Sequence, residues 1–227
     1  GAATGGEFSL GGAVIARGTD EEIIIDRCIL SNYNGLNIST LGSNTDIHFT
    51  NSVAKSSSSN QGQQFFGGLV WGGGAWMGTI DTLIIQNSSV LNMIGEAVVI
   101  YEEVKYGIID QCTFANITCG TLWYRGQNNL TFKNNLIVNT RSHGQAVYDV
   151  NNWGISIPGG NGVMSILTQN APTGENQTYD HLNRNINWHN NVWWNQQAFI
   201  DFMQRDPWSW EETDEMGNVT TIHDTML

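Results

Sequence analysis

Glu102, Arg125 and Asp149 lie roughly 24 residues apart, with Tyr124 beside the arginine and Lys105 shortly after the glutamate. An arginine between two carboxylates can hold a substrate carboxylate, and a neighbouring tyrosine or lysine can remove a proton. These five residues are therefore the predicted catalytic set of a lyase-like site. The alternative is an ordinary salt-bridged ladder on a solvated face, where each ion pair contributes little stability.

Carboxylates at this spacing also suggest a cation. Glu102, Asp149 and Asp201 carry the hard oxygen ligands that Ca²⁺ prefers, and they are the predicted metal ligands. Ca²⁺ is the one cofactor that the residues suggest. The sequence contains no zinc-ligand spacing, no nucleophile elbow and no phosphate-binding loop.

Aromatic residues, nine of them Trp, predict a surface on which sugar rings stack. A flat indole in a loop can bind a sugar face, or it can pack as a lid over the flank of the fold. Trp188 and Trp193 differ from the loop residues because they fall in repeated apolar columns, where we expect them to fill the interior of the last coil. The predicted substrate-binding residues are Trp71, Trp76, Tyr101, His143, Tyr148, Trp153, Trp208 and Trp210.

The elements that must position these residues are short and repeated. Six segments share an apolar third and eighth position, a small or amide sixth position and, in five cases, Asn at the tenth. Columns that return about every 24 residues favour a solenoid over a β-sandwich, whose strands recur about every 8–12 residues without such identity. The segments are "IIIDRCILSN" (23–32), "IHFTNSVAKS" (47–56), "LIIQNSSVLN" (83–92), "GIIDQCTFAN" (107–116), "LTFKNNLIVN" (130–139) and "INWHNNVWWN" (186–195).

Asn134 and Asn135 interrupt an apolar segment, although asparagine is poor in strands. In stacked parallel coils, amides can donate up and accept down, and Asn tolerates the left-handed backbone of a sharp bend. The asparagines therefore predict architecture rather than chemistry. Cys28 and Cys112 share the sixth column three coils apart, too far for a disulfide, and we expect both to be free and buried.

These columns predict an all-β fold, a right-handed parallel β-helix with coils of about 24 residues and two loop insertions. The handedness follows from that of crossovers between parallel strands. We expect one domain over residues 1–227, with coils at about 10–202, insertions at about 57–73 and 151–183, and a loop or unfinished terminal coil at 203–227. Neither end carries a closing element, so we expect either a longer chain or end-to-end covering by other copies.

The Asn-rich coils, such as "NNLIVN" (134–139), resemble the pectin-lyase-like superfamily of right-handed parallel β-helices. Among its members they resemble the β-helix domains of bacterial cell-surface and polysaccharide-utilisation proteins. The resemblance spans roughly residues 10–202 and implies a polysaccharide partner and a cell-surface location. Of the polygalacturonase motifs only "SHG" (142–144) has a weak counterpart, and the paired aspartates are missing.

The net charge of the chain limits the classes of partner that it can attract. A net charge of −12 with nine Lys and Arg gives no attraction to nucleic acid, and it favours a neutral glycan or a cation-bridged acidic one. The sequence contains no run of about eighteen apolar residues, so it predicts no membrane-spanning helix. We therefore expect an extracellular polysaccharide-interacting protein, a lyase or hydrolase on a uronate-containing glycan. The alternative from another class is a non-catalytic binding, adhesin or fibre module.

Overall fold

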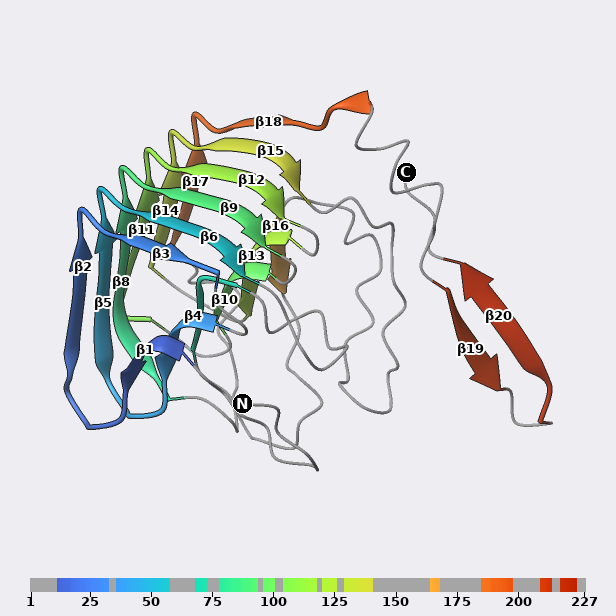
Figure 1. Cartoon of the computed structure of the whole chain (residues 1–227), viewed down its shortest axis with the longest axis horizontal. Helices are drawn as coiled ribbons and strands as arrows, with labels where there is room; N and C mark the ends of the chain where they lie inside the picture. Colours follow the sequence, from blue (N-terminus) through green and yellow to red (C-terminus); the bar gives the residue numbers. More distant parts are fainter. Residues whose placement is uncertain are drawn as a thin grey trace.

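The protein is an all-β chain whose strands form three parallel six-stranded sheets, an arrangement consistent with a parallel β-helix. Figure 1 shows the strands stacked coil upon coil, from β2 and β3 at one end to β17 and β18 at the other. The computed structural model describes residues 12–32, 36–57, 68–72, 78–93, 96–100, 104–117, 120–125, 129–140, 164–167, 185–197, 209–213 and 217–223.

Each coil contributes one strand to each sheet, in the order sheet 1, sheet 2, sheet 3. Sheet 1 contains β1 (Gly12–Ala16), β4 (Leu36–Thr40), β7 (Val70–Gly72), β10 (Glu96–Ile100), β13 (Gly120–Arg125) and β16 (Met164–Leu167). Sheet 2 contains β2 (Glu22–Asp26), β5 (Thr45–Thr50), β8 (Ile80–Gln86), β11 (Tyr106–Asp110), β14 (Leu130–Lys133) and β17 (Ile186–His189). Sheet 3 contains β3 (Ile29–Ser31), β6 (Val53–Ser57), β9 (Ser89–Met93), β12 (Thr113–Ile117), β15 (Leu136–Thr140) and β18 (Val192–Trp194).

Four of the described strands lie where the sequence predicts insertions or loops. β7 falls inside the expected first insertion, and β16 falls inside the expected second one. β19 (Ser209–Thr213) and β20 (Val219–His223) form an antiparallel hairpin in place of the expected loop or unfinished coil. Short strands beside Gly-rich stretches carry too few side chains for a periodic pattern, which is why β7 and β16 are hard to recognise from sequence.

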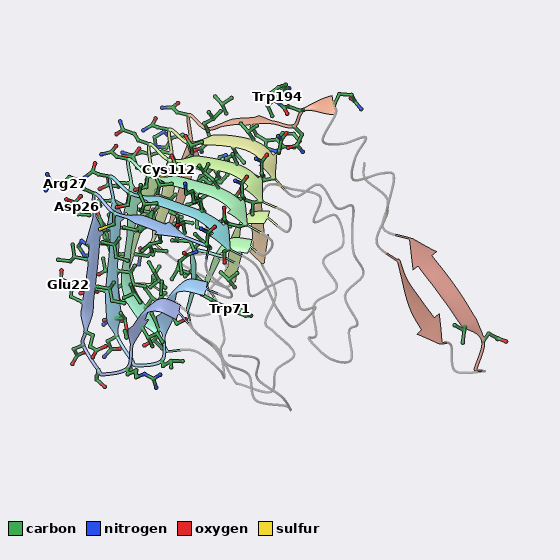
Figure 2. All side chains as sticks on the ribbon, in the orientation of Figure 1. Glu22, Asp26, Arg27, Trp71, Cys112 and Trp194 are labelled. Atoms are coloured by element: carbon green, nitrogen blue, oxygen red, sulfur yellow. The ribbon has the colours of Figure 1, made fainter. Side chains whose placement is uncertain are left out.

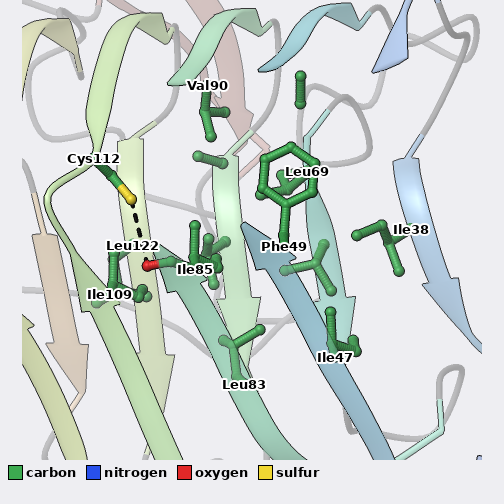
Figure 3. Close-up of a cluster of buried hydrophobic side chains, with 14 of the residues drawn as sticks. Ile38, Ile47, Phe49, Leu69, Leu83, Ile85, Val90, Ile109, Cys112 and Leu122 are labelled. Atoms are coloured by element: carbon green, nitrogen blue, oxygen red, sulfur yellow. Dashed lines mark hydrogen bonds between the residues drawn. The ribbon is translucent and has the colours of Figure 1, made fainter. Parts of the chain in front are cut away.

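Inward-facing side chains of the three sheets make one continuous core (Figure 3). Phe49, Ile85, Ile109 and Phe132 are fully buried, and each such side chain stabilises the fold by about 1.5–3 kcal/mol. The predicted third-position column is confirmed by the strand register, which pairs Ile25, Phe49, Ile85, Ile109, Phe132 and Trp188 in that order.

The last coil departs from the expected burial. Trp188 stacks on Phe132 with ring centroids 4.3 Å apart and an angle of 4° between the rings, so its column position is as predicted. Its side chain is nevertheless 41% exposed, and Trp193 is 55% exposed. The prediction that both fill the interior is wrong in this respect, because β17 and β18 are the outermost strands of their sheets.

Sharp corners in the coil use left-handed backbone, mostly at Asn. Every fifth position of the repeat, between sheet 2 and sheet 3, has a positive φ, for example 54° at Asn134. Asn reaches this conformation at lower cost than most residues, since its short amide bonds locally. The fifth positions are Arg27, Asn51, Asn87, Gln111, Asn134 and Asn190. Asn134 is therefore a corner residue, in keeping with the architectural role that its sequence context predicts.

Asn135, the next residue, belongs to a buried ladder. Its Oδ1 accepts a hydrogen bond from the backbone N–H of Cys112 (2.9 Å), and its Nδ2 donates to the carbonyl of Ile109 (3.1 Å). Ser52 and Ser88 perform the same role in earlier coils, because the backbone N–H groups of Cys28 and Ser52 donate to their hydroxyls. The sixth column thus satisfies backbone groups that would otherwise be buried without partners.

The two described cysteines have different environments. Cys112 is buried and free, and burial raises the pKa of its thiol to about 12. Cys28 is also free but exposed, so the prediction that both are buried is wrong for Cys28. It lies in the first described coil, at the connection between β2 and β3, the outermost strands of their sheets at that end.

Candidate functional site

The three corners of the coil differ in how much their length varies. The connection from sheet 2 to sheet 3 has two residues in every coil: 27–28, 51–52, 87–88, 111–112, 134–135 and 190–191. A corner that never changes length keeps every ladder in register. This corner therefore has the character of a structural element rather than of a recognition loop.

The connections into and out of sheet 1 vary widely. Those from sheet 3 to sheet 1 span 32–35, 58–69, 94–95, 118–119 and 141–163, and those from sheet 1 to sheet 2 span 17–21, 41–44, 73–79, 101–105, 126–129 and 168–185. In solenoids, variable insertions gather on the face that binds. We define the sheet-1 flank as the six strands of sheet 1 together with these connections, and it is the candidate functional site.

The described side chains of β4, β7 and β10 in sheet 1 are buried on both faces, whereas Ala13 of β1 is exposed. Val70 and Val98 belong to the core, so Trp71 and Val99 face the opposite side, by the alternation of a strand. These outward side chains are only 6% and 1% exposed, and Ser39, which pairs with Trp71, is fully buried. The outer face of these three strands is therefore an enclosed surface rather than an open one.

Polar groups are buried within this enclosed surface. The Nδ2 of Asn37 donates to the carbonyl of Gly68 (3.0 Å), and the hydroxyl of Thr40 donates to the carbonyls of Trp71 (3.3 Å) and Gly78 (3.1 Å). The hydroxyl of Ser39 has no hydrogen-bond partner among the described residues. A buried hydroxyl without a partner costs free energy, so a ligand or water that bonded it would be favoured.

Trp71 is placed differently from its prediction. The sequence assigns it to a loop, where its indole would be free to stack on a sugar. In the structure it lies in β7 and is 6% exposed (Figure 2). The loop assignment is wrong, because Trp71 lies in the described strand Val70–Gly72. Counting back from Ile85 along the repeat instead predicts the strand of this coil at residues 74–78.

Arg125 and Tyr124 both lie in β13, within the sheet-1 flank. The register pairs Tyr124 with Ile100 and Ile166, and Arg125 with Leu167, whereas the predicted column places Tyr101, Glu102, Tyr148 and Asp149 beside them. Toward β10 the predicted register is wrong by one residue, because Ile100 takes the place beside Tyr124 that is predicted for Tyr101. Toward β16 it is wrong by a whole strand, because β16 pairs with β13 where the prediction places Tyr148 and Asp149. Counting across bends of unequal length produced the error, since the sheet 1 to sheet 2 connections are 101–105 and 126–129 in successive coils.

Most remaining candidates lie outside the described residues. This applies to the predicted metal ligands Glu102, Asp149 and Asp201, and to the aromatic and histidine candidates Trp76, Tyr101, His143, Tyr148, Trp153 and Trp208. Trp210 lies in β19, where only its backbone is described. In sequence, all of these except Asp201, Trp208 and Trp210 fall in connections that border sheet 1.

Lys105 lies at the corner between sheets 1 and 2, and its amine forms an ion pair with the carboxylate of Asp81. The hydrogen bond and the charge of Asp81, with smaller contributions from Asp20 and Asp46, raise the pKa of Lys105. A lysine held protonated is a poorer proton acceptor at neutral pH but a good local positive charge. The carboxylates around it are residues that the site prediction missed, although the spacing of Asp81 and Lys105 by one coil could have indicated them.

The outer face of sheet 2 carries further charged groups, among them Glu22 and Asp26 (Figure 2). His48 lies 3.8 Å from Glu22, and Lys133 lies 3.5 Å from Asp110. Hydrogen bonds from Asn51 (2.7 Å) and Thr50 (2.9 Å) lower the pKa of Asp26. These groups pair between neighbouring coils, as an ordinary surface ladder does, and offer no convergent catalytic set.

No group of three His, Cys, Asp or Glu side chains that could hold a metal ion occurs in the part of the chain that the structure describes. Within the same residues, no helix is long and apolar enough to cross a membrane. Comparisons with family models, with curated proteins and with solved structures found no match for this chain. The geometry of the sheet-1 flank is therefore the feature of this chain that indicates a function.

Proposed function

We propose that this chain is an extracellular, cell-surface right-handed parallel β-helix of the pectin-lyase-like kind, with coils of about 24 residues, that binds a polysaccharide at its sheet-1 flank. One observation carries the proposal. Connection length varies only at the two ends of the sheet 1 strands, while the sheet 2 to sheet 3 corner keeps two residues in every coil. Variation confined to one side is the usual mark of a recognition surface on a repeat scaffold.

The catalytic form of the proposal is a lyase on a uronate-containing glycan. Arg125 would hold the substrate carboxylate, with Tyr124 or Lys105 as the proton-abstracting group and Glu102, Asp149 and Asp201 as oxygen ligands for Ca²⁺. The raised pKa of Lys105 weighs against Lys105 in the proton-abstracting role at neutral pH. The net charge of −12 makes a bridging cation useful, because an acidic polymer is otherwise repelled.

The non-catalytic form is a carbohydrate-binding, adhesin or fibre module that uses the same flank. Trp76 and Trp153 would then supply stacking surfaces in the connections that border sheet 1. The charged ladders of sheet 2 favour neither form, because they pair within themselves.

A screen of uronate polysaccharides for new absorbance near 235 nm, with and without Ca²⁺, combined with binding to immobilised neutral and acidic glycans, tests the proposal. Arg125→Ala should lower binding or turnover at least tenfold, whereas Lys133→Ala, a basic residue of sheet 2, should leave both unchanged. Binding without turnover assigns the non-catalytic form. Equal effects of the two substitutions, or no binding to any glycan, would remove the sheet-1 flank as a polysaccharide site.

A further inference from the structure

The outer face of sheet 3 is mostly apolar, and its described polar positions are Ser31, Lys55, Ser89 and Thr113. A sheet face that contacts solvent normally carries polar side chains, whether the sheet is antiparallel or parallel. Here Leu136 is 43% exposed, Val192 is 60% exposed and Trp194 is 55% exposed. The register aligns Leu91, Val138 and Trp194 in one outward column through Ala115 of β12, so the apolar surface crosses from coil to coil. Figure 2 labels Trp194 on the last strand of this sheet.

The same face lacks negative charge. The whole chain has a net charge of −12, and the outer face of sheet 2 carries carboxylates such as Asp26 and Asp110. Among the described outward positions of sheet 3 there is no Asp or Glu, and Lys55 is the charged residue present. Two copies of an acidic protein can therefore approach through sheet 3 without bringing carboxylates together.

We propose that a second copy of this chain packs against the outer face of sheet 3 and forms a symmetric dimer by sheet-on-sheet contact. Two flat β faces pack about 10 Å apart through interdigitating side chains, and a two-fold axis lets one patch serve as its own partner. Aliphatic side chains such as Leu91 and Val138 are suited to such packing. A sugar platform would instead need several aromatic rings, and Trp194 is the one aromatic residue among the described outward positions of this face.

The size of the face sets the strength of the dimer. Six strands spaced by about 4.8 Å and strand segments of about 16 Å give roughly 450 Å² per copy, or about 900 Å² in all. Stable interfaces bury about 1,200–2,000 Å², so this contact falls below the standard size. The dimer is therefore weak, and its population depends on protein concentration in the micromolar range or above.

Sedimentation velocity over a wide concentration range tests the proposal. The 25.0 kDa chain should shift toward twice its mass and no further as concentration rises. Leu91→Glu, on the outer face of sheet 3, should weaken the dimer at least tenfold. Ile84→Glu is the matched control, since Ile84 is a half-buried outward residue of the same coil but belongs to sheet 2.

A second substitution keeps the test independent of folding. Lys55→Glu changes an exposed side chain, so the fold should survive, and the added carboxylate should weaken the dimer as Leu91→Glu does. A chain that stays monomeric at all concentrations would overturn the proposal, as would equal weakening by Ile84→Glu. Species that grow beyond the dimer and disappear in Trp193→Ser would assign association to the exposed last coil instead and would also overturn it.

Discussion

The corner between sheets 2 and 3 and the connections around sheet 1 follow different rules within one chain. The corner has two residues in every coil. The first has a left-handed backbone conformation, and the second is a small or amide residue that bonds to the neighbouring coil. Around sheet 1 the connections range from two residues to more than twenty, and the described side chains of β4, β7 and β10 between them are buried on both faces. The coils stack with a constant length only at the corner between sheets 2 and 3. The two corners around sheet 1 can therefore vary in length and take part in recognition.

The largest expected effect comes from breaking the constant corner. One glycine inserted between Asn134 and Asn135 would shift β15 by a residue and turn its buried side chains outward. We expect unfolding, or a loss of more than about 4 kcal/mol in the free energy of unfolding.

The matched control is one glycine between Asn60 and Gln61, in the connection 58–69, which should cost less than about 0.5 kcal/mol because closure entropy grows slowly with loop length. Urea titration followed by circular dichroism measures both variants. Equal losses would mean that the two regions do not differ in the way their lengths suggest.

Asn135→Ala should have the next largest effect. It leaves the backbone N–H of Cys112 and the carbonyl of Ile109 without their side-chain partners inside the stack. We expect a loss of about 2–4 kcal/mol, since each unsatisfied buried group costs about 1–3 kcal/mol. Asn135→Ser should recover part of it, because Ser52 and Ser88 occupy the same column in earlier coils. A serine variant no better than alanine would show that the ladder is dispensable.

Cys112 should make the stack sensitive to alkali. Burial raises the pKa of its thiol from 9.0 to about 12 in the folded state. Above pH 9 the unfolded chain therefore releases this proton first and binds fewer protons than the folded chain, so the free energy of unfolding falls as pH rises. The slope approaches about 1.4 kcal/mol per pH unit between pH 9 and 12.

Comparing Cys112→Ser with the parent chain isolates this contribution from the other cysteines, tyrosines and lysines. Serine already fills this column at Ser52 and Ser88, so the variant should fold, and its stability should fall less between pH 8.5 and 10.5. Parallel pH profiles for the two proteins would contradict a buried, protonated thiol.

The smallest expected effect concerns the corner residues that are not asparagine. Gln111 has a φ of 55°, a conformation that costs a long side chain more than it costs Asn. Gln111→Asn should therefore stabilise the chain by about 0.5 kcal/mol, and the reverse change Asn87→Gln should destabilise it by a similar amount. Thermal unfolding of both variants resolves the sign. Stabilisation by both would remove backbone conformation as the reason for the asparagines.

The sequence predicts those parts of the fold in which the same types of side chain repeat from coil to coil. The inward columns and the architectural role of the asparagines are predictable because similar positions return in successive coils, whereas the separate roles of Asn134 at the corner and Asn135 in the ladder come from the structure. The exposure of Trp188 and Cys28 is not predictable, since a column does not reveal which of its members lies in the outermost coil. Membership of the pectin-lyase-like superfamily stays a prediction.

The candidate site was less predictable than the scaffold. The pairing of Arg125 with Glu102 and Asp149 was counted across bends of unequal length, where one residue more or less moves a side chain to the opposite face. Trp71 was assigned to a loop because a three-residue strand within glycines leaves no periodic signal. Both errors fall on sheet 1, the side whose connections vary.

The buried sixth column is directional. In Asn135 and Asn191, Oδ1 accepts from a backbone N–H of the preceding coil, at Cys112 and Asn135. Their Nδ2 groups donate to carbonyls of that same preceding coil, at Ile109 and Phe132. Each coil therefore supplies the polar partners for the corner of the coil before it, so the corner of one coil is satisfied only once the next coil has stacked on it.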